Sequence, residues 1–200
     1  MNKITRILQS EIENRMQPGK VMLLFGARRV GKTMLIKAIA EKFTGRKMIL
    51  NGEDNSTHLL LQDRTAANYR ILLQDTDLLI IDEAQNIPEI GLKLKLMVDE
   101  IPTVQIIASG SSSFDLFNLT GEPLVGRSQT FYLFPFSQEE LLQIENRAEA
   151  IQNLPEKLIY GTYPQLIDLS YQQKQEYLTD MVNAYLLRDI LNVEGLRNSN

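Results

Sequence analysis

The first 135 residues alternate between short apolar runs and longer stretches in which apolar residues recur at helical spacing. Short apolar runs of this kind are typical of buried parallel strands, and the longer stretches are typical of amphipathic helices. Strand followed by helix, repeated along the chain, predicts an α/β fold with a five-stranded parallel sheet between helices. The predicted strands are 21–25, 47–51, 78–83, 104–108 and 130–134, and the predicted helices are 2–16, 32–43, one or two within 56–73, and 88–100.

The pattern changes after residue 135, where no further strand is predicted. Ser137-Gln138-Glu139-Glu140 forms a capping box, which predicts a helix through Arg147, and further helices are predicted at 155–160 and 172–193. We therefore expect a core domain at 1–135 and a helical, lid-like subdomain at 136–200.

The composition fits an ordinary globular protein, with 44% hydrophobic and 23% charged residues. No apolar run approaches the roughly 18 residues of a membrane span. Met1 to Met16 mixes charged with apolar residues, unlike a signal peptide, so we expect a cytoplasmic protein without a membrane partner. The net charge of −4 gives no overall electrostatic signature of nucleic-acid binding, and the absence of cysteine excludes thiolate metal sites.

The most informative stretch is Gly26-Ala27-Arg28-Arg29-Val30-Gly31-Lys32-Thr33, which fits Gly-x-x-x-x-Gly-Lys-[Ser/Thr], the phosphate-binding Walker A loop. Its place between a predicted strand and a predicted helix is the context that this motif requires. Loop amides and the helix N-terminus would bind a polyanion. Lys32 would reach the β- and γ-phosphates of ATP at a solvent-facing site, and Thr33 would place its hydroxyl on Mg²⁺. The candidate nucleotide-binding residues here are Gly26, Ala27, Arg28, Arg29, Val30, Gly31, Lys32, Thr33 and Met34.

The second informative stretch is Leu78-Leu79-Ile80-Ile81-Asp82-Glu83, an apolar strand that ends in two carboxylates. Ligands in open α/β sheets bind at the carboxyl ends of the strands. Asp82 would therefore hold Mg²⁺ as the Walker B aspartate, and Glu83 would act as the general base on the attacking water. The alternative is that the pair only caps the following turn. An acidic pair favours the P-loop branch that has an additional strand and a catalytic glutamate.

Three further residues are candidates with open alternatives. Ser109 or Ser111, after the fourth strand, would sense the γ-phosphate, or would simply belong to a glycine-serine turn. Arg127, which follows a predicted short helix at 114–119 and a loop at 121–127, would stabilise charge on the transferred phosphoryl group in its own or a neighbouring subunit. Its alternative role is a structural salt bridge.

Taken together, the chain resembles the AAA-type ATPases of the archaeal-ATPase and STAND-related group, found in bacteria and archaea. The resemblance implies ATP and Mg²⁺ binding with hydrolysis, with Lys32, Thr33, Asp82, Glu83, a serine within 109–111 and Arg127 in the roles given above. Such proteins usually continue into a further C-terminal domain, so the resemblance also implies that this chain is a fragment. The matching segments are GARRVGKT at 26–33, LLIIDEAQNIP at 78–88, IIASGSSSFDL at 106–116, LVGR at 124–127, FYLFPFSQEEL at 131–141, YGTYPQLI at 160–167 and YLLRDIL at 185–191.

The leading hypothesis is an enzyme that hydrolyses ATP with Mg²⁺ to drive or gate a conformational change. One alternative is a nucleotide-operated switch with little turnover, and another is a fragment of a DNA-associated motor. ATP is the expected ligand. A homo-oligomer is the arrangement in which Arg127 would act across subunits, and the sequence names no protein partner.

Overall fold

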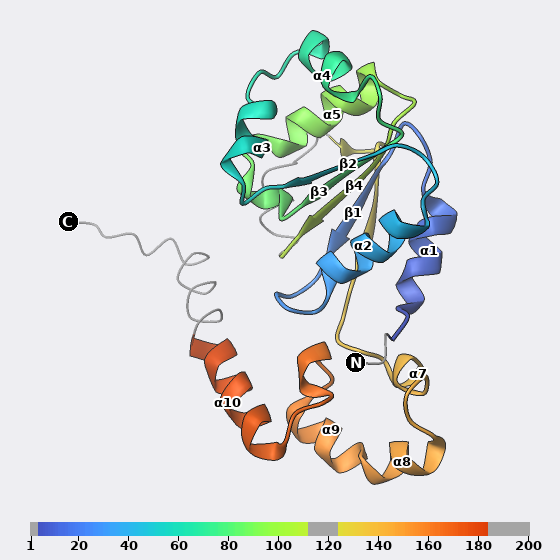
Figure 1. Ribbon diagram of the computed structural model, residues 1–200, viewed down its shortest axis with the longest axis vertical. Coiled ribbons are helices and arrows are strands. Elements are labelled where there is room, and N and C mark those ends of the chain that lie inside the picture. Colours follow the sequence, from blue (N-terminus) through green and yellow to red (C-terminus); the bar gives the residue numbers. More distant parts are fainter. Residues whose placement is uncertain (1–3, 112–123, 184–200) are drawn as a thin grey trace, which may run out of the picture. The chain divides into compact units, whose positions relative to one another are not determined.

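A computed structural model of the protein describes residues 4–111 and 124–183. The chain divides into two compact units. The larger unit is Thr5–Phe134, and the smaller unit holds, among the described residues, Ile4 and residues 135–183. Figure 1 shows the elements of both units. No helix in the described part of the chain is long and apolar enough to cross a membrane.

The larger unit is built on a five-stranded sheet in the order β2-β3-β4-β1-β5. All four strand pairs are parallel, as the alternation of strands and helices predicted. Strand β4 lies between β1 and β3, which makes it the additional strand between the glycine loop and the acidic pair. The strands are β1 (Val21–Phe25), β2 (Lys47–Asn51), β3 (Leu78–Asp82), β4 (Gln105–Gly110) and β5 (Ser128–Tyr132).

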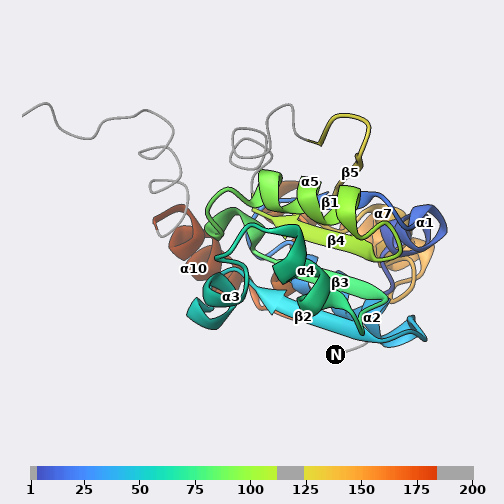
Figure 2. The ribbon, with the colours of Figure 1, turned by 90° about the horizontal axis from the view of Figure 1, so that it is seen from above.

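Helix α1 precedes the first strand of this unit, and α2 to α5 follow β1, β2 and β3 along the chain. Helix α1 packs beside α2, and α4 lies beside α5 (Figures 1 and 2). The helices are α1 (Ile7–Arg15), α2 (Lys32–Lys42), α3 (Asn55–Leu60), α4 (Ala66–Leu73) and α5 (Ile90–Glu100), with a 3₁₀ turn η1 (Ala84–Asn86) between β3 and α5.

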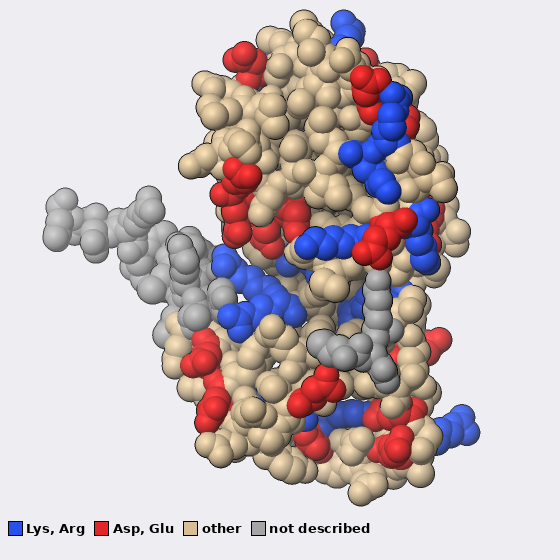
Figure 3. Space-filling view, viewed as in Figure 1, with Lys and Arg blue, Asp and Glu red and all other residues tan. Residues whose placement is uncertain are grey.

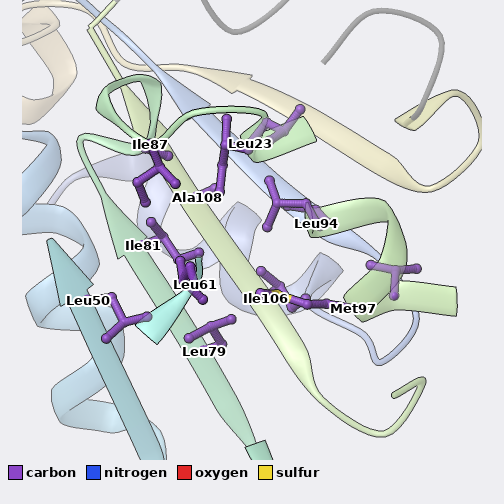
Figure 4. Packing of buried hydrophobic residues seen from close by; sticks show 14 of the residues in the cluster. Leu23, Leu50, Leu61, Leu79, Ile81, Ile87, Leu94, Met97, Ile106 and Ala108 are labelled. Carbon is purple, nitrogen blue, oxygen red and sulfur yellow. The ribbon is translucent and has the colours of Figure 1, made fainter. Parts of the chain in front are cut away.

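Alternate residues of the central strands face opposite sides of the sheet, and this determines what each face packs against. Leu79 and Ile81 of β3 belong to a hydrophobic cluster with residues of α4 and α5 (Figure 4). Ile80, between them, is equally buried but lies outside that cluster. It therefore faces the other side of the sheet, where α2 contacts β4. By the same alternation Asp82, two residues beyond Ile80, points to the side of α2.

The smaller unit contains short helices joined by tight turns. Ser137 and Glu140 form the predicted capping box. The helix that it begins ends at Leu141 rather than Arg147, because the chain turns and a second capping box at Asn146 starts a new helix. The elements are α7 (Gln138–Leu141), α8 (Arg147–Gln152), α9 (Leu154–Tyr160), the 3₁₀ turn η3 (Pro164–Leu166) and α10 (Tyr171–Met181).

Several predicted boundaries were wrong by a few residues. Strand β5 spans 128–132 rather than 130–134, α5 begins at Ile90 rather than at Pro88, and the helix predicted over 2–16 begins at Ile7. The stretch 56–73 is two helices. The helix predicted at 114–119, the loop residues 121–123 and the C-terminal part of the helix predicted at 172–193 lie outside the described residues.

The apolar residues of α1 and α5 differ in how deeply they are buried. On α1, Gln9 is buried and Ile7 is 45% exposed. On α5, Leu92 is 37% exposed, whereas Leu94 is fully buried. The whole of α5 is rich in apolar residues, so the pattern alone did not determine which of them pack against the sheet.

Helix α5 offers a matched test of this packing. We expect Leu94→Ala to lower the free energy of unfolding by about 2–5 kcal/mol, because it leaves a cavity against the sheet. The same change at Leu92 should cost less than about 1 kcal/mol, because that side chain is already partly in water. Urea unfolding followed by circular dichroism would measure both. Equal losses for the two variants would contradict the orientation of the helix.

Candidate functional site

The loop between β1 and α2 requires glycine at two positions for two different reasons. A Cβ on Gly26 would overlap the carbonyl oxygen of Leu133, so only a bare backbone fits there. Gly31 has a φ of 105°, a region that residues with a side chain rarely adopt. Gly31 also precedes the first residue of α2 and offers no side chain to cap it. The first N–H groups of a helix have no partner within the helix, so this N-terminus can bind an anion.

The ammonium group of Lys32 lies inside this loop. Its Nζ donates to the carbonyl oxygens of Gly26 at 2.9 Å and of Ala27 at 3.2 Å. Burial lowers the pKa of Lys32, opposed by the charges of Glu83 and Asp82. The residue is only 4% exposed, so the expectation of a solvent-facing lysine was wrong. Two carbonyl oxygens of the loop are therefore the present partners of this ammonium group, in the place where an anionic ligand could neutralise its charge.

Asp82, at the end of β3, contacts Thr33, in the first turn of α2. The Thr33 hydroxyl donates to Asp82 Oδ2 at 2.7 Å. Ser109 Oγ, at the end of β4 and fully buried, donates to the other oxygen, Asp82 Oδ1. Both strand-end residues thus point to the side of α2, and the Walker A and Walker B stretches form one site.

These oxygens suit a hard cation such as Mg²⁺. Mg²⁺ binds oxygen ligands and is usually held by one or two protein groups, with waters and substrate phosphates completing its shell. Thr33 Oγ1 and Asp82 Oδ2 are adjacent and could supply two such ligands. Within residues 4–111 and 124–183, no group of three or more His, Cys, Asp or Glu side chains could hold a metal by itself. The donor set therefore fits a cation that depends on a bound ligand for the rest of its shell.

Glu83 has a left-handed backbone, with φ at 49°. Its N–H lies 3.1 Å from Asp82 Oδ1 and 3.3 Å from Ser109 Oγ, and both atoms accept a hydrogen bond from it. Glu83 precedes η1 but makes no side-chain cap to it, unlike the alternative in which the acidic pair only caps a turn. Strain of this kind is tolerated where the surrounding contacts enforce it, and the bonds of the Glu83 N–H to Asp82 and Ser109 are such contacts.

Two residues of the site were not identified from the sequence. Gln85 donates from Nε2 to Glu83 Oε2 at 2.6 Å and to Ser111 Oγ at 3.4 Å. Gly52, after β2, donates its N–H to Asp82 O at 2.8 Å, and a Cβ there would overlap the carbonyl oxygen of Glu83. The only signal for Gln85 was its place two residues after Glu83. Glycine is required at position 52 because the backbone after β3 lies against it, and the residues around Gly52 in the sequence do not indicate this.

The two candidate serines have different partners. Ser109 contacts Asp82, and Ser111 contacts Gln85 and through it Glu83. Their bonds therefore join the ends of β3 and β4, unlike the alternative of a turn that bonds only to its own backbone.

Arg127 is not brought to this site. It immediately precedes Ser128, which pairs with Val21 at the amino end of β1, whereas the glycine loop follows Phe25 at the carboxyl end. Four residues at about 3.3 Å each separate those ends. Arg127 Nε instead contacts Asp99 Oδ1 at 2.6 Å. Within its own chain, Arg127 therefore lies at the amino ends of the strands, away from a phosphate bound in this loop. Its ion pair with Asp99 corresponds to the alternative interpretation, a structural salt bridge.

The remaining loop candidates differ in exposure. Val30 is fully buried beneath the loop, and Met34 in the first turn of α2 is 63% exposed. Arg28 is half-buried and Arg29 is exposed, with a left-handed φ of 63°. Main-chain amides bind the phosphate in loops of this kind, so such a loop does not require these four side chains as donors.

Comparison with known proteins agrees with this architecture. The AAA domain family matches residues 18–142. An uncharacterized protein of Methanocaldococcus jannaschii is 25% identical over 211 residues, which covers 98% of this chain and 47% of that protein. The chain therefore spans about half the length of this curated relative.

Two solved structures are similar in fold. A Walker-type ATPase of Pyrococcus abyssi matches with a TM-score of 0.57 and 14% identity, covering 96% of this chain and 76% of its own. A signal transduction ATPase with numerous domains (STAND), from Pyrococcus horikoshii and with a tetratricopeptide repeat sensor, matches with a TM-score of 0.56 and 14% identity. That match covers 90% of this chain and 32% of the other. Both confirm the P-loop NTPase fold.

The burial of Lys32 predicts a cost to stability that depends on pH. Because its pKa is lowered in the folded chain, the charged lysine destabilises the fold at neutral pH, and Lys32→Met should be more stable than wild type. That difference should shrink as the pH rises from the lowered pKa towards 10.5, since the unfolded chain alone still binds the proton in this window. Urea unfolding over a pH series would measure it. Lys37→Met, on the exposed side of the same helix, is the control, and a Lys32→Met variant less stable than wild type throughout would contradict the prediction.

Proposed function

The chain belongs to the AAA domain family, and from this premise we propose that it is an ATPase that uses Mg²⁺ and whose turnover drives or gates a conformational change. The family and the fold support nucleotide binding and hydrolysis in general terms. The single observation that carries the finer proposal is the contact between Thr33 and Asp82, which unites the phosphate loop and the acidic strand end.

The phosphate loop would bind the triphosphate through its amides, the N-terminus of α2 and Lys32. A phosphate oxygen is a stronger acceptor for an ammonium than a carbonyl oxygen, because the hydrogen bond is charged on both sides. ATP would therefore draw Lys32 Nζ from its present partners, Gly26 O and Ala27 O. The buried charge of Lys32 would then be compensated, and binding would stabilise the loop.

Thr33 and Asp82 are the residues that would hold Mg²⁺. Bound there, the ion would neutralise charge on the β- and γ-phosphate oxygens. Ser109 holds the second oxygen of Asp82 and so fixes the rotation of its carboxylate.

Glu83 is the proposed general base. As the water oxygen attacks the γ-phosphorus in line, its bond to phosphorus forms while the bond to the bridging oxygen of ADP breaks. The proton leaves the water for the Glu83 carboxylate, and the products are ADP and inorganic phosphate.

Two alternatives use the same binding site. In a nucleotide-operated switch, ATP would alter the smaller unit with little turnover, and the description of the Pyrococcus horikoshii neighbour as a signal transduction ATPase favours that class. Tight retention of nucleotide with slow turnover would support the switch. A DNA-associated motor has less support, because the net charge of the sequence is −4, and the face shown in Figure 3 carries acidic as well as basic side chains. Absence of a salt-sensitive gel shift would exclude it.

A homo-oligomer is part of this proposal only through Arg127. Since Arg127 does not reach the site of its own chain, a role on the phosphate would have to be in a neighbouring subunit. Light scattering with and without Mg·ATP would test this, and a monomer under both conditions would exclude it.

The loss of Glu83 as base should separate binding from turnover. We expect Glu83→Gln to slow phosphate release by about 100- to 10,000-fold, because the amide cannot accept the proton of the attacking water. ATP binding should persist, since the loop and Asp82 are unchanged. A coupled phosphate assay and a titration with fluorescent ATP would measure the two quantities. The exposed Glu139→Gln in the smaller unit is the matched control, and equal rates for wild type and Glu83→Gln would remove Glu83 from the mechanism.

The loss of Lys32 should abolish binding itself. Saturating Mg·ATP, at 100 times the dissociation constant, should stabilise the wild type by about 2.7 kcal/mol. Lys32→Ala should remain folded and show no such stabilisation, because the triphosphate loses its buried cation. Thermal unfolding with and without Mg·ATP would measure the difference. A wild-type stabilisation that survives in Lys32→Ala would contradict the assignment of the loop.

A further inference from the structure

Gln85 holds a position that the acidic pair alone does not explain. It lies in η1, the 3₁₀ turn that follows Glu83, and its side-chain nitrogen Nε2 lies 2.6 Å from Glu83 Oε2. The same nitrogen lies 3.4 Å from Ser111 Oγ, just beyond the end of β4. One amide group thus joins the candidate general base to the end of the neighbouring strand.

The orientation of this amide follows from the chemistry of its partner. An ionised carboxylate only accepts hydrogen bonds, so the amide must present its NH₂ group to Glu83 and turn its carbonyl oxygen elsewhere. That oxygen, Gln85 Oε1, is buried and has no hydrogen-bond partner within the described part of the chain. Leaving a buried acceptor without a donor costs free energy. A molecule that donates a hydrogen bond at this point would recover that cost.

We propose that Gln85 completes the site of the attacking water together with Glu83. This inference rests on the proposed ATPase function and assigns a further residue to it. A water has two protons to donate. One would be donated to the oxygen of Glu83 that Gln85 does not occupy, and the other to Gln85 Oε1. The lone pairs of the water are then left to face the γ-phosphorus.

The two acceptors have different roles during hydrolysis. Glu83 receives the proton as the bond from oxygen to phosphorus forms and the bond to ADP breaks. Gln85 stays neutral and keeps the second proton of the water in its hydrogen bond. Its Nε2 holds the Glu83 carboxylate in place, so Gln85 both contacts the water and positions the base. Positioning of this kind is effective because small displacements of a reacting group reduce the rate strongly.

A set of four proteins tests this: wild type, Gln85→Met, Glu83→Gln and the double variant. Methionine keeps the length of glutamine but removes both hydrogen-bonding ends. We expect Gln85→Met to lower kcat for phosphate release about 100-fold, with the dissociation constant of Mg·ATP and the melting temperature close to those of wild type. Asn86→Met, an exposed change in the same turn, should retain the wild-type kcat.

The double variant distinguishes this role from a merely structural one. If Gln85 acts on the same water as Glu83, the double variant should be no slower than Glu83→Gln alone, because residues that act as a unit are not additive. Gln85→Glu is the second variant: it keeps an acceptor of similar size but has no NH₂ group for Glu83, and it should also be slow. A direct readout is the side-chain amide resonance of Gln85 in ¹⁵N-labelled protein, identified by its loss in Gln85→Met, which should shift in Glu83→Gln.

The outcomes separate this inference from the proposed function. A wild type that does not hydrolyse ATP overturns the function and the inference with it. A wild type that hydrolyses ATP, with a slow Glu83→Gln and a Gln85→Met at the wild-type kcat, overturns the role of Gln85 alone. Losses that multiply in the double variant, or a Gln85→Met that changes only the dissociation constant, overturn it as well. The role of Gln85 is supported if Gln85→Met lowers kcat and the double variant is no slower than Glu83→Gln alone.

Discussion

The contact between the Thr33 hydroxyl and the Asp82 carboxylate is the interaction on which the site depends. It joins the first turn of α2 to the end of β3, two elements 49 residues apart along the chain. Side chains alternate along β3, so the arrangement that buries Leu79 and Ile81 on one face of the sheet directs Asp82 to the opposite face, where α2 lies. The same alternation directs Ser109 of β4 to that side, and Ser109 fixes the second oxygen of Asp82. The packing of the core thus sets the geometry of the candidate cation site.

Several groups around this contact are arranged at a cost to the fold. Lys32 is buried with a lowered pKa, Glu83 has a left-handed backbone, and Gln85 carries a buried acceptor without a partner among the described residues. Each of these features destabilises a folded protein. They occur close together at the carboxyl ends of β1, β3 and β4. An anionic ligand, a cation and a water bound there could offset their cost to stability. That coincidence is a stronger argument for a ligand site than any one of the features.

The strands and the glycine loop could be predicted from the sequence, because residues that are neighbours along the chain determine each of them. Short apolar runs predicted all five strands, and the glycine spacing with Lys32 and Thr33 predicted the loop. The sequence did not decide contacts that depend on how the elements pack. Leu92 and Leu94 are chemically equal candidates for the core, and only the docking of α5 on the sheet separates them. Arg127 was a reasonable phosphate ligand by type, but the register of β5 against β1 places it beside Asp99 at the opposite edge.

The sequence by itself therefore determined the class of fold, the phosphate loop and the acid pair, since each is encoded by residues that are neighbours along the chain. The tertiary structure alone decided which groups meet. It brought Ser109 to Asp82 and Gln85 to Glu83, placed the backbone of Gly52 against that of Glu83, and removed Arg127 from the site. These contacts join separate strand ends or depend on the path of a turn. Their geometry follows from strand order, register and backbone conformation, which no local spacing of residue types records.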